Sequence, residues 1–178
     1  GTSPATLFDG PIAGALHRLG ELWETDEAGI FLEHAATSVC MEAVNLVRLL
    51  IPPAPDDAPV ALGGAPERDP YLLPTAMAAT VLAEAGYQTI NLGAHTPPAT
   101  FRHAAATHHP RLVWIAVKNP LEPAERTALV EQAIQPLGEQ GATVIVGGQG
   151  ALAAADAWPA AVHLLDSMDA LAAFVEGE

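Results

Sequence analysis

The sequence contains few cysteines, few aromatic residues and no long apolar run, and each shortage excludes a class of protein. A single cysteine, Cys40, excludes an internal disulfide and a cysteine-based zinc cluster. Aromatic residues make up 5% of the chain, so we expect a core of Ala, Leu and Val and closely packed helices. No apolar run approaches the ~20 residues that span a bilayer, and no signal peptide is recognisable. We therefore expect a cytoplasmic protein without membrane contact.

Basic residues are also scarce. Lys and Arg number 7 against 21 Asp and Glu, which gives a formal net charge of −14. An acidic surface repels phosphate, so the chain by itself is a poor candidate for binding DNA or RNA, and solubility explains the acidity. The chain begins with Gly1-Thr2-Ser3-Pro4 and lacks an initial Met. We expect any DNA contact to belong to a separate domain upstream.

The first third of the chain has the spacing of a helical bundle. Apolar residues three and four positions apart predict a first helix that bends or begins at Pro11, and a second helix over residues 26–50. The segment Pro52-Pro53-Ala54-Pro55-Asp56-Asp57 cannot continue a helix and favours turns. These features predict a helical bundle over residues 1–51 and a linker over residues 52–57.

The remainder, residues 58–178, alternates between strand and helix. Five strands and five helices are expected: strands at 60–63, 88–92, 111–117, 143–146 and 162–164, and helices at 72–85, 98–107, 122–140, from 151 and from 167. This alternation predicts an α/β fold, with a Rossmann-like doubly wound parallel sheet after the bundle. Such sheets bind ligands at the carboxyl ends of their strands, here the loops 64–71, 93–98, 118–120 and 147–150.

Two of these loops carry candidate binding residues. Glycines in the turn Gly147-Gly148-Gln149-Gly150 let the backbone approach a flat ligand or a phosphate, although a tight strand-to-helix turn explains them equally well. The loop Glu67-Arg68-Asp69-Pro70-Tyr71 offers two carboxylates, a guanidinium and a phenol. Its alternative interpretation is an exposed turn in which Arg68 pairs with Asp69.

Catalytic and metal-binding motifs are missing. The seven histidines are scattered, and the adjacent pair His108-His109 is predicted to lie in an exposed loop. The sequence has no HExxH, no GxSxG and no P-loop motif. We therefore assign no catalytic residue and no metal ligand, and we expect a sensor or binding module and not a self-contained enzyme.

One combination of residues points to a family. Trp23, nine intervening residues and Glu33-His34 precede the proline linker, and a Rossmann-like segment with a late Gly-Gly follows. This order resembles the cobalamin-binding region of light-sensing, MerR-type transcription regulators. The resemblance implies that the bundle caps the upper face of adenosylcobalamin, with Trp23 near the adenosyl group and with Glu33 and His34 lining the same cavity.

The lower face of that implied site departs from the family pattern E-x-H-x-x-G. Glu67 matches its first position, but Asp69 stands in place of the histidine that ligates cobalt, and Leu72 replaces the glycine. A carboxylate is a poor substitute for imidazole on cobalt. Where the family carries a small serine beside the nucleotide tail, this chain has Trp114 or a neighbour, and an indole would fill much of that pocket.

Three interpretations follow. The cleft holds a cobalamin without a protein axial ligand; it holds another flat ligand, haem or a bilin, near His34 or His95; or it has lost the cofactor and is filled by Trp114 and Tyr71. The first two predict a ligand-sensing regulatory domain of a MerR-like regulator, which is a homo-oligomer. The alternatives are a cofactor-free dimerisation and signal-relay domain, or a corrinoid carrier module of a methyltransferase system.

Overall fold

The N-terminal helices form the outermost layer of the molecule. The computed structural model describes residues 1–23 and 27–177, without the side chains of residues 19–30 and 33. Helices α1 (Pro4–Leu7) and α2 (Ala13–Trp23) are joined by a π-helical turn, η1 (Phe8–Ile12), which contains Pro11. Proline lacks an N–H and its ring clashes with the preceding helical turn, and the wider π turn accommodates both. Helical structure therefore runs through Pro11 without a break.

Helix α3 (Glu27–Leu50) runs beside α2, and a proline-containing segment then leads to the sheet. This segment is attached to the second strand, because the Gln88 side-chain amide donates a hydrogen bond of 2.8 Å to the carbonyl of Pro55. The helix occurs where the sequence predicts it. The division at residues 52–57 into two separate units stays a prediction.

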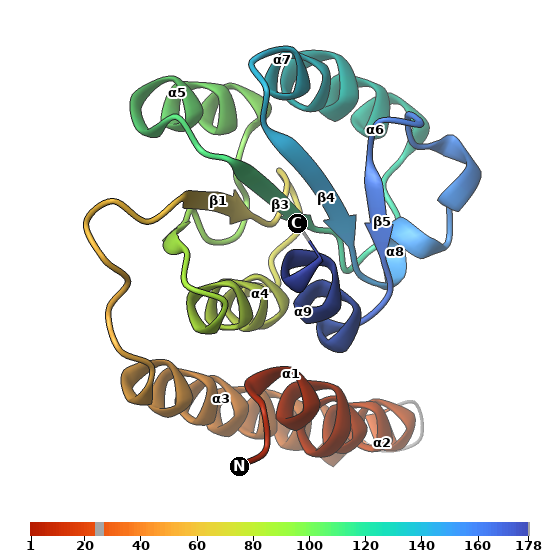
Figure 1. Cartoon of the computed structure of the whole chain (residues 1–178). Helices are drawn as coiled ribbons and strands as arrows, with labels where there is room; N and C mark the ends of the chain where they lie inside the picture. The colour runs from red at the N-terminus through yellow and green to blue at the C-terminus, as the bar shows by residue number, and fades with distance from the viewer. Residues whose placement is uncertain (24–26, 178) are drawn as a thin grey trace.

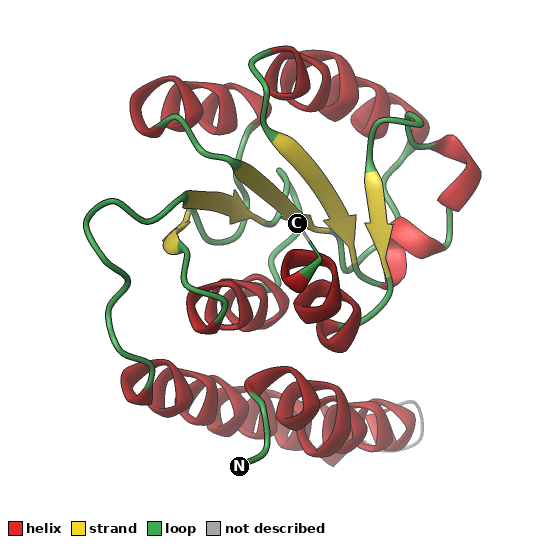
Figure 2. Cartoon of the chain, viewed as in Figure 1, coloured by secondary structure: helices red, strands yellow, loops and turns green. Residues whose placement is uncertain are grey.

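Five parallel strands form the sheet, in the order β2-β1-β3-β4-β5. Figure 2 shows the sheet in yellow between two layers of helices. The strands are β1 (Val60–Gly64), β2 (Gln88–Asn91), β3 (Leu112–Ala116), β4 (Thr143–Gly147) and β5 (His163–Leu165). Helices α4 (Leu72–Glu84) and α9 (Met168–Glu176) cover one face (Figure 1). The other face is covered by α5 (Pro98–His108), α6 (Pro123–Leu129), the π turn η2 (Val130–Ile134) and α7 (Gln135–Glu139).

The predicted α/β class and the doubly wound parallel sheet are confirmed. Each strand begins and ends within two residues of its expected position. The helix expected over 122–140 contains the π turn η2, so it is not one regular α-helix. The helix expected from residue 151 is replaced by two short segments, α8 (Gln149–Leu152) and the 3₁₀ turn η3 (Ala155–Ala157).

The N-terminal helices share a core with the sheet domain. Phe8 and Val44 belong to the same buried cluster as Trp114 of β3 and Leu82 of α4. A separate cluster on the other face of the sheet surrounds Phe101. The sheet therefore separates two cores, and the helical layer completes one of them.

A polar contact also attaches the first helices to the last one. The carboxylate of Asp9 accepts hydrogen bonds from the backbone N–H groups of Met168 (3.0 Å) and Asp169 (2.7 Å). These groups belong to the first turn of α9, where backbone N–H groups have no partner within the helix. A negative charge is also favourable at the N-terminus of a helix. Asp9 thus caps α9 from a distant part of the chain.

Gly63 provides a test of packing in the core. A Cβ atom at this position of β1 would overlap both the indole and the carbonyl of Trp114. We expect Gly63→Ala to lower the free energy of unfolding by roughly 1–3 kcal/mol, measured by urea denaturation. Gly138→Ala is the matched control, because a Cβ there meets open space in a helix and should raise stability by about 0.5–1 kcal/mol. Equal effects of the two substitutions would contradict this packing.

The reactivity of Cys40 provides a test of whether the inner side of α3 packs against the core. Its side chain is partly buried against the core, and this burial raises the pKa of the Cys40 thiol above its usual range. The thiolate, which is the reactive species, therefore forms only at higher pH. We expect iodoacetamide to alkylate Cys40 more slowly than free cysteine at about pH 8, with the difference lost in denaturant. An equal rate in the folded protein would place Cys40 outside the core.

Candidate functional site

The candidate site lies where the strand order reverses. From β1 the chain crosses to β2 on one side, and then returns past β1 to β3 on the other side. The loops after β1 and β3 therefore diverge at the carboxyl edge of the sheet, which is where open α/β sheets bind their ligands. Asp69 lies in the first of these loops, and Lys118 and Asn119 lie in the second.

The side chain of Asp69 closes this position. It is 2% exposed, and its Oδ2 atom accepts hydrogen bonds from the backbone N–H groups of Lys118 (2.7 Å) and Asn119 (3.4 Å). Its Oδ1 atom accepts a hydrogen bond from the N–H of Tyr71 at 3.1 Å. Hydrogen bonds from N–H groups to a carboxylate are among the stronger ones in proteins. Asp69 thus joins the two loops across the switch point, with its oxygens directed at backbone groups.

The backbone of Asp69 connects a third loop. The N–H of His95 donates to the carbonyl of Asp69 at 3.0 Å. Next to it, the N–H of Ala65 donates to the carbonyl of Gly93, and the N–H of Thr96 donates to the carbonyl of Ala65. The loops after β1, β2 and β3 therefore form one hydrogen-bonded edge centred on Asp69.

Trp114 fills the space below this edge. Its indole is 2% exposed and lies against Gly63, which has no side chain to occupy that space. The indole N–H donates to the hydroxyl of Thr75 on α4 at 2.9 Å, and this hydroxyl in turn donates to the side chain of Asn91 at 3.0 Å. Each of these polar atoms has a hydrogen-bond partner, so the core between β3 and α4 is packed and its polar groups are paired.

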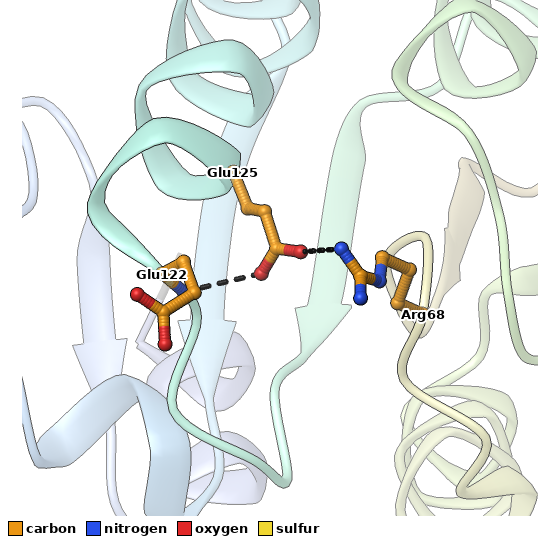
Figure 3. A network of polar contacts seen from close by, with 3 residues as sticks. All are labelled: Arg68, Glu122 and Glu125. Carbon is orange, nitrogen blue, oxygen red and sulfur yellow. Dashed lines mark hydrogen bonds and ion pairs between the residues drawn. The ribbon is translucent and has the colours of Figure 1, made fainter.

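Ionic and polar contacts close the outer rim of the edge. Arg68 points across to α6 and pairs with Glu125 at 2.8 Å, while Glu125 also accepts a hydrogen bond of 3.1 Å from the N–H of Glu122 (Figure 3). The predicted pairing of Arg68 with Asp69 is therefore wrong, since Asp69 is occupied by backbone groups. Lys118 donates to the side chain of Gln149.

The glycine turn after β4 is explained by packing within the protein. Gly148 has a φ of 102°, which favours glycine, and a Cβ there would overlap the carbonyl of Val117. A Cβ at Gly150 would overlap the carbonyl of Asn119, and one at Gly147 would lie 2.9 Å from the carbonyl of Leu165. These glycines let the loop after β3 and the end of β5 approach the turn closely.

The remaining predicted residues do not gather into one pocket. Tyr71 is 38% exposed, and Glu67 and His95 are also exposed. His34 lies on α3 and is exposed. The side chains of Trp23 and Glu33 are outside the described residues, so the upper-face assignment made for them stays a prediction.

The sequence places the loop 118–120 at this edge but does not single out Lys118 within it, and it gives no indication of the polar contacts of Thr75, Asn91 and Glu125. One signal was available for the first of them, because Lys118 is the only lysine in the chain and follows the third strand directly. The others are ordinary polar residues within helices or strands, and their spacing along the chain does not reveal that they are partners.

Other kinds of site find no support within the part of the chain that the structure describes. No group of three or more His, Cys, Asp or Glu side chains there is arranged to hold a metal ion. None of its helices is long and apolar enough to cross a membrane. Two surface hollows lie elsewhere: one beside His109 and Pro110, the other of about 330 Å³ between Arg126 and Trp158.

Comparison with solved structures identifies the fold. The chain resembles the monomethylamine corrinoid protein of Methanosarcina barkeri with a TM-score of 0.73 and 16% identity, over 99% of this chain and 85% of that one. It also resembles a chain of the methanol:cobalamin methyltransferase complex MtaBC of Methanosarcina barkeri with a TM-score of 0.55 and 17% identity, over 98% and 69% of the two chains. No family model matches the sequence, and a search of curated proteins finds no match. The helical layer and sheet together thus have the fold of corrinoid proteins.

The role of Asp69 is tested by removing its carboxylate. Asp69→Ala leaves the part-buried N–H of Lys118 without its charged partner, so we expect a loss of roughly 1.5–3 kcal/mol in the free energy of unfolding. Asp69→Asn keeps one acceptor oxygen and should lose less. The exposed Glu67→Ala is the control and should change stability by less than about 0.5 kcal/mol. Urea denaturation of the four proteins measures this, and an unaffected Asp69→Ala protein would show that the loops do not depend on the carboxylate.

Proposed function

We propose that this chain is a regulatory domain with the corrinoid-protein fold. In this proposal it acts as a cofactor-free oligomerisation and signal-relay module. The observation that carries the proposal is the occupation of Asp69. This residue stands where the resembled family has its cobalt-ligating histidine, and its carboxylate is buried against the backbone N–H groups of Lys118 and Tyr71.

The chemistry of the residues present does not fit a histidine-ligated corrinoid. Turning the Asp69 carboxylate toward a metal would break its hydrogen bonds with the backbone N–H groups of Lys118 and Tyr71, and it would offer an oxygen ligand where an imidazole is required. The resemblance assigns a small serine beside the nucleotide tail to the position of Trp114 or a neighbour, and the Trp114 indole is buried against Gly63. A tail entering there would have to displace an indole that is hydrogen-bonded to Thr75.

The setting of a MerR-type regulator is the finer part of the proposal. It is supported by the Trp23, Glu33 and His34 pattern, and by the acidic charge of −14, which leaves DNA contact to another domain. In this setting a signal would alter how the helical layer packs on α4 and α9, and so shift the population of associated copies.

A cobalamin sensor is the second candidate. It is favoured by the similarity of nearly the whole chain to a corrinoid protein, with the helical layer included. In this case cobalamin would bind without an axial ligand from the protein. A corrinoid carrier module of a methyltransferase system is a weaker candidate, since the missing histidine counts against it directly.

A chromophore-retention experiment separates these functions. The purified chain is incubated in the dark with adenosylcobalamin, and in parallel with haem and with biliverdin, then desalted and examined by absorbance. We expect all three chromophores to separate from the protein, because Asp69 and Trp114 close the lower site. A cobalamin spectrum that co-elutes with the protein in stoichiometric amount would contradict the proposal and favour the sensor.

The variant Asp69→His with Trp114→Ser is the matched comparison in that experiment. It restores the ligand type and opens the space beside β3, so we expect it to retain cobalamin better than the natural chain. Circular dichroism establishes that the variant is folded. If the natural chain and the variant both fail to bind, the two substitutions do not by themselves explain the loss.

A further inference from the structure

Helix α3 presents a regular apolar stripe to solvent. We call it the α3 stripe, and it consists of Leu32, Ala35, Val39, Glu42, Leu46 and Leu49. These residues are spaced by three and four positions in alternation, which is the a and d spacing of a two-helix seam. All six are exposed, including 64% of Val39, 64% of Leu46 and 80% of Leu49.

The opposite side of α3 already has its partners. Val44 is buried, and Cys40, Met41 and Val47 pack against the core that the helical layer shares with α4. At 100° per residue the α3 stripe points away from this inner side. Figure 1 shows α3 in the outermost layer, with α4 on its inner side. Isolated exposed leucines need no explanation, but an ordered stripe of this length marks an interaction surface.

The charge pattern favours a second copy of the same chain as the partner. The chain carries a net charge of −14, so two copies repel each other over most of their surfaces. Within the stripe, Glu42 is the single ionisable residue. The stripe is therefore the surface on which two copies meet with the least repulsion, and a two-fold axis lets the same apolar residues serve both sides.

The sequence of the stripe also selects the orientation. In a parallel pair Glu42 would face Glu42 of the other copy in one layer, and Ala35 would face Ala35 and leave a gap. In an antiparallel pair each a position faces a d position. Leu32 then meets Leu49, the small Ala35 meets the large Leu46, and Val39 meets Glu42. Large residues thus fill the space beside small ones, and the two carboxylates lie in different layers.

We propose that two copies of this chain associate through the α3 stripe as antiparallel helices, so that α2 and α3 of both copies form a four-helix arrangement. This gives the relay domain its partner, and in that respect the inference rests on the proposed function. Its physical basis is separate, since it depends on α3 and not on Asp69 or Trp114.

The oligomeric state of the full chain tests the pairing. Analytical ultracentrifugation over a concentration series should show a monomer–dimer equilibrium for the natural sequence. The variant Val39→Glu with Leu46→Glu places four carboxylates in the seam of the dimer and should weaken association by roughly a hundredfold or more. Asn45→Glu is the matched control, because Asn45 is exposed on α3 but lies outside the stripe, and it should still dimerise.

Spin labels test the orientation. In a Cys40→Ser background, Asn45→Cys carries the label, and in the antiparallel dimer the two labels lie nine residues apart along the helix axis, about 13.5 Å. A parallel dimer would bring them level with each other, and a short label separation would overturn the proposed orientation.

Two results would overturn the pairing itself: a natural chain that stays monomeric, or a dimer that survives Val39→Glu with Leu46→Glu. Capture of a different protein by the stripe of a monomeric chain would assign the surface to another partner. The chromophore-retention result does not decide between these outcomes, so failure of the pairing and failure of the proposed function can be told apart.

Discussion

The carboxyl edge of the sheet depends on one buried carboxylate. Three loops that come from three different strands meet at Asp69, through its two oxygens and its backbone carbonyl. Loops that surround a ligand in an open α/β sheet must leave a space between them, and their backbone N–H groups would then face water or the ligand. Here the N–H groups of Lys118 and Tyr71 face Asp69 instead. Asp69 is thus the residue that connects the loops of this edge.

The core below the edge is consistent with that closure. The Trp114 indole fits against β1 only because Gly63 has no side chain there. Its N–H donates a hydrogen bond to the hydroxyl of Thr75 on α4. The chain has few aromatic residues, and the large indole of Trp114 fills space in this core that a smaller side chain would leave empty. Because both the indole and its polar partners are satisfied, opening this region would expose apolar surface and break hydrogen bonds together. The corrinoid-protein fold is combined here with a tightly packed core between β3 and α4.

The sequence predicted the order of strands and helices closely, and the reasons are local. Alternating apolar runs, the glycine after α4 and the prolines before β1 act over a few residues, so they can be recognised without a structure. Two π turns escaped prediction, because apolar spacing, and a proline such as Pro11 that predicts a bend or a helix start, do not distinguish a π turn from a regular α-helix. The site was predicted less well. Asp69 was identified as unusual, but its partners Lys118 and Asn119 lie about fifty positions away. The alternative interpretation pairs Arg68 with the adjacent Asp69, whereas in the structure Arg68 forms an ion pair with Glu125.

The contact between Asp9 and the start of α9 has a consequence for biosynthesis. Met168 and Asp169 are synthesised 159 and 160 residues after Asp9. The helical layer also packs on α9, so part of the surface that completes its core is synthesised well after the layer itself. During synthesis, η1 and its buried residue Phe8 therefore lack their contacts with α9 until α9 has been made. A chaperone that shields apolar helices would be most useful to this chain in that interval.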